Sequence, residues 1–268
     1  MNTLECQMVE ILTDLKKNHG AVGVKAEFEA EGTKLEELLR LKEVCMESYL
    51  KLVLKIGGCE SIRDMLEART VGVNTLVAPM VESAYALRKY LQAVCKVFSQ
   101  EERDQTDILC NIETITAIEN FPAMLTIPEV GILKGIVVER VDLCYSAGLG
   151  DQDIDNDKIN SLVMDVAREA KKRELDFTVG GGVSAHSLPF FSTLKDCLGA
   201  YETRKIRFQS QKALKEKPDK GILKALAFEV LWLRNKLDYY KNISAADKER
   251  MSLIEQRYMK QIHSLMLQ

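Results

Sequence analysis

The sequence lacks the strong charge imbalance and the long apolar runs that mark several common classes of protein. Among its 268 residues, 37 basic side chains are matched by 40 acidic ones, for a formal net charge of -3. This balance gives no electrostatic reason to expect binding to nucleic acid or to an anionic membrane surface. No apolar run reaches the roughly 18–20 residues of a membrane-spanning helix, so we expect no membrane association.

Paired cysteines and a secretory signal are also missing. The seven cysteines are scattered singly, without a CxxC pair. This favours reduced cysteines packed as small apolar residues over a disulfide framework or a zinc site. The first six residues do not show the basic and then apolar layout of a secretory signal. We therefore expect a cytoplasmic protein.

Apolar residues alternate repeatedly between helical and strand spacing along the first 210 residues. Strands are predicted over 22–31, 50–56, 75–80, 107–113, 132–142, 176–180 and 201–208, and helices over 3–18, 34–48, 60–71, 83–98, 115–125, 156–173 and 187–196. Such alternation indicates βαβ units and a parallel sheet. No GxGxxG follows the first strand, which speaks against a dinucleotide-binding fold. We expect an α/β protein with a TIM-type (β/α) barrel, although a closed barrel usually has about eight strands and this pattern shows seven.

The pattern changes near residue 211, where a basic and polar stretch precedes two helical patterns. The first runs over 222–240, and Ser244 followed by Asp247 resembles the N-cap of a second helix. Its apolar face is continued by Met251, Ile254, Tyr258, Ile262 and Leu265. We therefore expect a barrel with an N-terminal helix over 1–210 and a C-terminal helical pair over 211–268, through which the chain forms a homo-oligomer.

Two carboxylates each follow a short apolar run. Glu113 follows residues 108–112, and Asp142 follows residues 135–141. A carboxylate at the end of a buried strand is costly unless it has a partner. Two of them on separate strands suggest a shared cation, and Mg²⁺ or Mn²⁺ would suit because hard ions prefer oxygen ligands. The pair predicts a metal site and hence an enzyme.

Lys55 alternates with Leu54 and Ile56 along the second predicted strand, so it is expected to point into the barrel. Its ammonium group could bind an anionic substrate. With a pKa lowered by burial it could instead form a Schiff base with a ketone. The structural alternative is an ion pair with Glu29 or Glu31.

Further candidates follow other predicted strands, at the end where barrel enzymes carry their chemistry. A loop after residue 179 could cradle an anion on its backbone NH groups, although a tight turn would need the same glycines. His186 in this loop is a candidate general acid or base, or a hydrogen-bonded loop residue. The predicted substrate-binding residues are Gly180, Gly181, Gly182, Ser184, Glu29 and Arg204.

Four segments carry a resemblance to a known family. They are Leu52-Val53-Leu54-Lys55, Leu76-Val77-Ala78-Pro79-Met80-Val81-Glu82-Ser83, Asn111-Ile112-Glu113-Thr114 and Val141-Asp142-Leu143-Cys144-Tyr145-Ser146-Ala147-Gly148. In order and spacing, over residues 22–150, they resemble the HpcH/HpaI-type aldolase and citrate lyase β-subunit family. The resemblance implies a modified TIM barrel with a divalent metal, which makes or breaks carbon–carbon bonds next to a pyruvate, oxaloacetate or acyl-CoA enolate.

The resemblance also assigns roles to individual residues. It implies Glu113 and Asp142 as the metal ligands, in agreement with the reading from burial. Lys55 stands where the family usually has an arginine that holds the substrate's carboxylate or enolate oxygen, and Arg140 could take over that role. Glu139 stands where glycine is common. The sequence thus favours a metal-dependent carbon–carbon lyase acting on a 2-oxo acid or acyl-CoA, with a Schiff-base aldolase or a non-catalytic scaffold or ligand sensor as alternatives.

Overall fold

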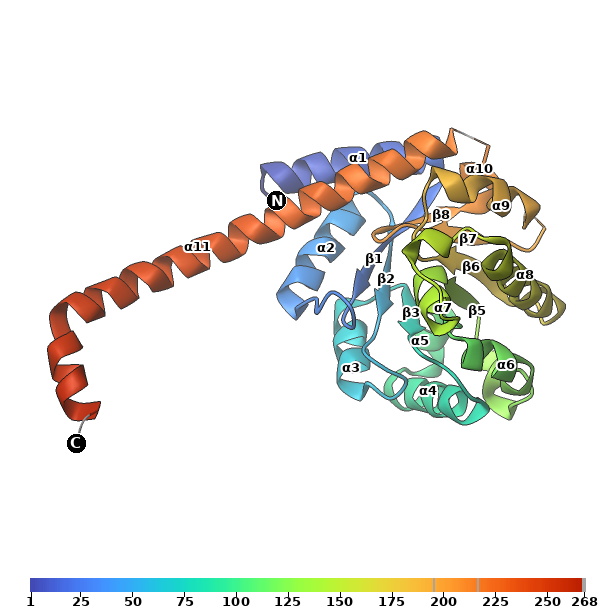
Figure 1. The fold of residues 1–268 in the computed structure, drawn as a ribbon, viewed down its shortest axis with the longest axis horizontal. Coiled ribbons are helices and arrows are strands. Elements are labelled where there is room, and N and C mark those ends of the chain that lie inside the picture. Colours follow the sequence, from blue (N-terminus) through green and yellow to red (C-terminus); the bar gives the residue numbers. More distant parts are fainter. Residues whose placement is uncertain (195, 216, 267–268) are drawn as a thin grey trace.

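The computed structural model describes residues 1–194, 196–215 and 217–266, with side chains described up to residue 259 apart from the two gaps. Within these ranges, eight strands close into a barrel in sequence order (Figure 1). The strands are β1 (Ala21–Glu27), β2 (Lys51–Lys55), β3 (Thr75–Ala78), β4 (Asp107–Asn111), β5 (Gly135–Glu139), β6 (Asp176–Gly180), β7 (Ala200–Glu202) and β8 (Ile206–Gln209). The predicted TIM-type barrel is confirmed.

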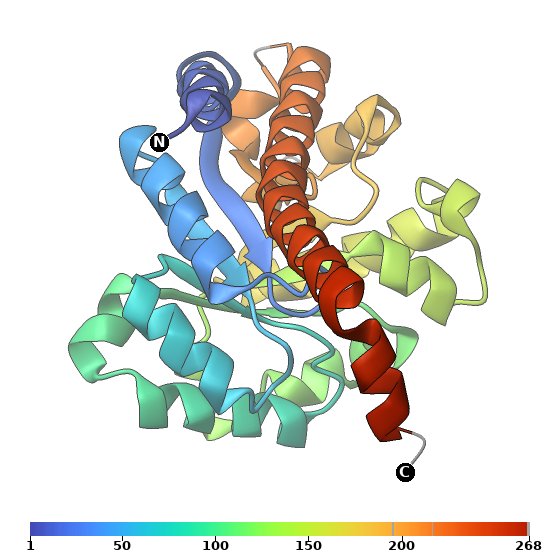
Figure 2. The same cartoon turned by 90° about the vertical axis from the view of Figure 1, so that its left-hand side faces the viewer.

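Helices surround the barrel (Figures 1 and 2). They are α1 (Thr3–His19), α2 (Leu35–Glu47), α3 (Ile62–Val71), α4 (Ala84–Val97), α5 (Gln100–Gln105), α6 (Ile115–Met124), α7 (Arg140–Ser146), α8 (Asp157–Lys172), α9 (Leu188–Thr193), α10 (Ser210–Ala213) and α11 (Pro218–Met266). Short 3-10 turns lie at η1 (Pro128–Ile132), η2 (Asp151–Asp153) and η3 (Ala185–Ser187). In the part of the chain that the structure describes, none of the helices is long and apolar enough to cross a bilayer.

The eighth strand comes from residues 201–208, and the prediction that these residues form a single strand was wrong. The chain turns at Thr203, so that β7 and β8 form an antiparallel hairpin in which Tyr201 pairs with Phe208. β8 also pairs antiparallel with β1, whereas β1 to β7 run parallel to one another. The hairpin was missed because residues 203–205 contain no glycine, proline, asparagine or aspartate to mark a turn.

Two predicted strands end three or four residues earlier than the sequence pattern suggested. β1 ends at Glu27 instead of residue 31, and β5 ends at Glu139 instead of residue 142. Helix α7 begins directly at Arg140, so Asp142 lies in its first turn, where an acidic side chain is favourable. The apolar spacing of residues 135–143 continues across this junction and conceals it.

The predicted C-terminal helical pair was also wrong, because α11 runs without a break through Ser244 to Met266. Ser244 and Asp247 resemble a helix start, but no proline or glycine interrupts residues 222–266. The side chains of Ile262 and Leu265, predicted to continue the apolar face, lie outside the described ones. Figure 1 shows the first half of α11 beside α1 and the second half extending away from the barrel, with a bend before its end.

The two faces of the strands bury different kinds of residue. Outward side chains such as Leu54, Leu76 and Ile136 pack with the helices in the main apolar core. Inside the barrel, Val53, Val77, Leu109 and Val137 form a small separate apolar cluster. Most other side chains of the interior are charged, and these lie on β1, β7 and β8 and near the ends of β2 and β5.

Close pairing of β5 and β6 depends on Gly135. A Cβ atom at this position would lie 2.5 Å from the backbone oxygen of Asp176, its partner in the ladder. We predict that Gly135→Ala lowers the free energy of unfolding by about 1–3 kcal/mol, because the strands must shift apart. Gly131→Ala is the matched control, since no atom lies within 4 Å of its added Cβ. Urea unfolding of both variants measures the difference, and equal stabilities would contradict this account of the β5–β6 contact.

Candidate active site at the carboxyl end of the barrel

Lys25 lies inside the barrel and is almost fully buried. Its Nζ atom is 2.7 Å from Oε1 of Glu139, 3.1 Å from Oε1 of Glu27 and 3.4 Å from Oε2 of Glu202. These carboxylates come from β5, β1 and β7, so one ammonium group joins three strands. Burial alone would lower the pKa of Lys25, but the three negative charges raise it well above its usual value. Lys25 is therefore a permanent cation.

The same carboxylates bind further basic residues. Arg207 on β8 lies 2.7 Å from Oε1 of Glu202 and donates a 2.8 Å hydrogen bond to Oγ1 of Thr178. Arg204 in the β7–β8 hairpin lies 3.2 Å from Oε2 of Glu27. Burial opposes ionisation of Glu27, yet the charges of Lys25 and Lys55 lower its pKa. The interior is thus an ion network in which acidic and basic groups neutralise each other.

Lys55 is buried at the end of β2, and Lys55, Arg204 and Glu29 join the network at the carboxyl end of the barrel. The Nζ atom of Lys55 lies 2.8 Å from Oε2 of Glu29 and 3.7 Å from Oε1 of Glu27. Burial alone would lower the pKa of Lys55, but Glu27 and Glu29 outweigh it and the pKa is raised. A lysine with a raised pKa stays protonated at neutral pH, which is unfavourable for a Schiff-base nucleophile.

Glu113 follows β4 and is buried, without an ion pair to any described residue. Its Oε1 accepts a hydrogen bond from the backbone NH of Met80 at 2.6 Å, and its Oε2 accepts one from Nδ2 of Asn111 at 2.8 Å. Burial raises the pKa of Glu113 to about 7, and the two hydrogen bonds only partly offset this. Oδ1 of Asn111 is itself buried without a hydrogen bond to the described residues. This site therefore has unused oxygen acceptors and a carboxylate without a cation.

Asp142 is exposed and has no hydrogen bond or ion pair within the described part of the chain. It follows β5, which pairs directly with β4, and the register sets Asn111 beside Val137. Glu113 and Glu139 each lie two residues beyond this pair, and Asp142 is three residues further, at the same end of the barrel. Both predicted metal ligands thus come from the carboxyl ends of neighbouring strands.

These residues fit a hard divalent cation. Such ions take carboxylate and amide oxygens, and Glu113, Asp142 and Asn111 supply groups of this kind. Among the described residues, no group of three or more His, Cys, Asp or Glu side chains is arranged to hold a metal. A site formed by Glu113 and Asp142 would have two protein carboxylates, and Mg²⁺ would keep several waters or substrate oxygens as its other ligands there.

Arg140 is fully buried and its donors are used within the protein. It bonds Asp155 at 2.5 Å, Oγ of Ser187 at 2.9 Å and the carbonyl oxygen of Gly181 at 3.1 Å, and its guanidinium carbon lies 5.4 Å from the centre of the Phe191 ring. The prediction that Arg140 binds a substrate carboxylate is not supported by this environment. Its contacts instead fasten the loop after β6 to the start of α7.

The glycines of this loop are explained by close packing. A Cβ atom on Gly180 would lie 2.7 Å from Oε1 of Glu139, and one on Gly181 would lie 2.5 Å from the backbone nitrogen of Arg140. Gly181 and Gly182 also have φ values of +75° and +61°. Their predicted use as an anion cradle stays a prediction.

Two polar residues of the loop differ in their surroundings. Oγ of Ser184 accepts a hydrogen bond from the backbone NH of His186 at 3.2 Å, which caps η3. The side chain of His186 is exposed. Because the loop follows β6, His186 lies at the carboxyl end of the barrel, as predicted from the sequence.

Sequence reasoning missed several residues of the ion network. The missed residues are Lys25, Glu27, Glu139 and Arg207. A signal was present, since Lys25 and Glu27 alternate with Val24 and Ala26 in a strand that a barrel buries on both faces. Charged residues at these positions must point inward and find partners.

Comparison with models of protein families shows which family the chain belongs to. The model of the HpcH/HpaI aldolase/citrate lyase family matches residues 34–180, more than half of the 268 residues. The chain therefore belongs to this family of aldolase- and citrate-lyase-type enzymes, as the sequence motifs indicated. A search of curated proteins finds no match.

Solved structures share the fold at low sequence identity. A HpcH/HpaI aldolase/citrate lyase family protein from Burkholderia cenocepacia J2315 aligns with a TM-score of 0.56 and 11% identity, over 81% of this chain and 98% of the other. A citrate synthase variant aligns with a TM-score of 0.55 and 11% identity, over 91% and 90% of the two chains. A Haloferax volcanii malate synthase in complex with pyruvate and acetyl-CoA aligns with a TM-score of 0.53 and 12% identity, over 73% of this chain and 60% of the other.

Removing Lys25 should be much more damaging than removing an exposed lysine. Lys25→Met removes the cation that three buried carboxylates share and leaves Glu139 without an ion pair among the described residues, so we predict a loss of about 3–5 kcal/mol in unfolding free energy at neutral pH. The loss should shrink toward about pH 5, because acid protonates the unpaired Glu139 carboxylate of the variant. The lysine itself stays charged across this range, since its pKa lies above 10.5.

The matched control is Lys51→Met on the neighbouring strand, whose Nζ atom pairs with Asp107 at 3.1 Å on the surface. We expect it to lose at most about 1 kcal/mol. Urea unfolding at several pH values separates the two variants. Equal losses, or a loss for Lys25→Met that grows in acid, would be incompatible with the described network.

Addition of Mg²⁺ or Mn²⁺ should stabilise the protein through Glu113. A metal ligand must be deprotonated, and the Glu113 carboxyl with a pKa of about 7 is ionised only above that pH. We therefore predict a larger metal-induced rise in Tm at about pH 8 than at about pH 6. At a concentration of 100 times Kd the stabilisation is about 2.7 kcal/mol.

Glu113→Gln and Asp142→Asn should each abolish this rise. Asp107→Asn is the control, because Asp107 lies at the opposite end of β4 and pairs with Lys51 on the surface. Differential scanning calorimetry with and without metal makes the comparison. A metal effect that survives in Glu113→Gln would remove the basis for this site.

Proposed function

We propose that the protein is a divalent-metal-dependent carbon–carbon lyase, acting on a 2-oxo acid of the pyruvate or oxaloacetate type or on a related acyl-CoA. The observation that carries the proposal is Glu113, a buried carboxylate with a raised pKa and no cationic partner among the described residues, at the carboxyl end of a barrel of this family. Enzymes of the family are generally divalent-metal dependent. Barrel enzymes place their active sites at this end of the strands.

Glu113 and Asp142 would hold the cation, and Mg²⁺ or Mn²⁺ suits their oxygen atoms. When bound, the ion supplies positive charge that stabilises an enolate developing on the substrate. The charged state of Glu113 is then favoured, since a neighbouring cation lowers a carboxyl pKa.

Lys55 would orient the substrate. An ammonium group has three NH donors, and the contacts with Glu27 and Glu29 leave one of them for a substrate carboxylate oxygen. Because its pKa is raised, Lys55 keeps its charge throughout the neutral range. His186, exposed on the loop after β6, is the candidate to accept or return a proton. The adjoining Gly180–Gly182 segment and Ser184 remain candidates for contacts with a distal substrate group.

The experiment is a turnover assay on purified protein with oxaloacetate and 4-hydroxy-2-oxo acids, with pyruvate release as the readout. We predict Mg²⁺- or Mn²⁺-dependent activity that EDTA removes. Glu113→Gln should lower kcat by about 100-fold or more, corresponding to about 2.7 kcal/mol of transition-state stabilisation. Asp107→Asn, remote from the site on the same strand, should keep wild-type activity. Turnover that is unaffected by EDTA, or a fully active Glu113→Gln, would refute the proposal.

A Schiff-base aldolase using Lys55 has less support, because the pKa of this lysine is raised rather than lowered. The two mechanisms can be distinguished by chemical trapping. Borohydride with pyruvate would leave a covalent adduct on Lys55 only in the Schiff-base mechanism. A trapped adduct, located by peptide mass spectrometry, would replace the metal-dependent proposal.

One observation favours a second candidate, a barrel that binds a ligand without catalysis. Lys25, Lys55, Arg204 and Arg207 are all paired with carboxylates, so the network leaves no unpaired cation among these four to bind a dianionic substrate. Under this candidate the protein would bind a monoanion such as pyruvate but would turn over none of the 2-oxo acids. Isothermal titration beside the turnover assay distinguishes the two.

A further inference from the structure

The first part of α11 has two apolar faces. One face packs into the core of the same chain through Ile222, Ala225, Phe228 and Trp232. The other face is exposed and consists of Leu223, Leu226, Val230, Leu233 and Leu237, which we call the proximal stripe. Burying one stripe is enough to dock a helix on its own domain. The proximal stripe therefore has no role in the fold of a single chain.

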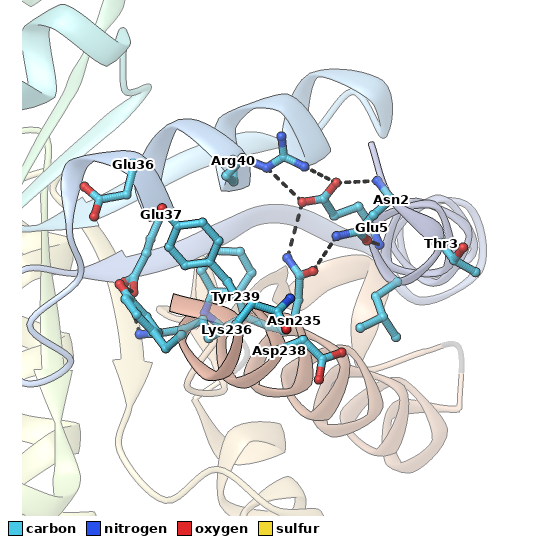
Figure 3. Close-up of a pocket in the computed structure, with 14 residues that line it drawn as sticks. Asn2, Thr3, Glu5, Glu36, Glu37, Arg40, Asn235, Lys236, Asp238 and Tyr239 are labelled. Atoms are coloured by element: carbon cyan, nitrogen blue, oxygen red, sulfur yellow. Dashed lines mark hydrogen bonds and ion pairs between the residues drawn. The ribbon is translucent and has the colours of Figure 1, made fainter. Parts of the chain in front are cut away.

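Polar contacts fix this part of α11 firmly to the barrel. Figure 3 shows them in a pocket of about 630 Å³ between α1, α2 and α11. Nδ2 of Asn2 donates to Oδ1 of Asn235 at 2.7 Å, and the buried Glu5 binds Arg40 and accepts a 3.3 Å bond from Asn235. Lys236 lies 3.1 Å from Glu37. The helix is thus held in one orientation, with the proximal stripe facing solvent.

The second part of α11 touches nothing within the described chain. Over residues 241–259 every described side chain is exposed except that of Ser252, which is half-buried. An isolated helix of this length is only marginally stable in water, because most helical stability in proteins comes from tertiary packing. Large apolar side chains such as Met251, Ile254 and Tyr258 are nevertheless exposed on it. A partner for this segment would supply the missing packing.

The spacing of the exposed residues specifies what kind of partner fits. After the proximal stripe, the same steps of three and four residues continue through Tyr240. They then reach five residues that we call the distal stripe: Ser244, Asp247, Met251, Ile254 and Tyr258. An apolar repeat of 3.5 residues is the signature of a helix that packs against another helix in a coiled coil. The apolar members of the two stripes are between 43% and 69% exposed.

We propose that α11 pairs with α11 of a second copy of this chain, in antiparallel orientation, so that the distal stripe of each copy covers the proximal stripe of the other. The two stripes have the same length, 15 residues each, and the same alternation of steps. In this register Leu237 faces Ser244, Val230 faces Met251 and Leu223 faces Tyr258. Each copy thereby supplies the packing that the other lacks.

Charge decides between the two orientations. A parallel, in-register pair would set Asp247 of one copy against Asp247 of the other inside the apolar seam, which is unfavourable. The antiparallel register sets Asp247 beside Arg234, an exposed residue without an ion pair in the described part of the chain. Polar residues within such a seam commonly specify orientation and register.

The contact is long enough for a stable dimer. Residues 223–258 form 36 residues of helix, about 54 Å in length at 1.5 Å per residue. Each copy contributes eight large apolar side chains from the two stripes.

The first test is the oligomeric state by sedimentation velocity and mass photometry. We expect the full chain to be a dimer at micromolar concentration. Leu233→Glu with Leu237→Glu should raise the dimer Kd by about 100-fold or more, without changing the Tm of the barrel. Leu66→Glu is the matched control, since Leu66 on α3 is 49% exposed, like Leu233 at 48%. A monomeric wild type, or a dimer that the double variant leaves intact, would overturn the proposal.

The second test addresses orientation by charge exchange. Arg234→Asp alone should weaken the dimer by about tenfold at low salt, because two symmetric ion pairs are lost. Adding Asp247→Arg in the same chain should restore the wild-type Kd if the helices are antiparallel. Failure of the second substitution to rescue the first would exclude this register.

Discussion

The ammonium group of Lys25 lies within the barrel, between carboxylates contributed by β1, β5 and β7. The other charged residues inside the barrel are tolerated because of this contact. Val53, Val77, Leu109 and Val137 fill only the side formed by β2 to β5. On the other side a set of charges takes the place of apolar side chains, and each of them needs the others to be tolerable in a medium with little water.

This arrangement constrains what the carboxyl end of the barrel can do. Glu139 forms an ion pair with Lys25, and its carboxylate occupies the space that a Cβ atom on Gly180 would need. The carboxylate of Glu139 is therefore held inside the barrel. Glu113 lies close by without a cation of its own among the described residues, and the charge of Glu139 raises its pKa further. The network therefore neutralises itself and leaves Glu113 as the carboxylate whose charge is not balanced. A divalent ion bound to Glu113 would balance this negative charge at the carboxyl end of the barrel.

Much of the fold could be predicted from the sequence, because the helices and strands follow apolar periodicity closely up to β6. The errors occurred where periodicity does not distinguish two outcomes. The β7–β8 hairpin lacks turn residues, and the step from β5 to α7 has no capping residue, since Glu139 makes no side-chain cap. Continuity of α11 through Ser244 was missed because a good N-cap sequence is no proof that a helix starts there.

The candidate site was predictable in part for a related reason. Glu113 was identified because a buried run ends in a carboxylate, and that placement depends only on the strand. Arg140 was assigned to the substrate because the strand was extended three residues too far, to residue 142, which placed Arg140 on the same side of the strand as Asp142. Two partners of Lys25, Glu139 and Glu202, come from strands more than 100 residues away in sequence, so no local pattern could reveal these contacts.

The reversal of direction at β8 has a consequence for the helix that follows. Because β8 returns the chain to the amino end of the barrel, α11 starts there, with Gly221 against His19, and climbs the full height of the barrel. About 17 Å beyond Gly221, at 1.5 Å per residue, the Trp232 ring lies against Lys205 in the hairpin at the other end of the barrel. One continuous helix thus spans the barrel from its amino end to its carboxyl end, so a partner bound to the exposed second half of α11 would be connected through it to the hairpin that carries Arg204 and Lys205.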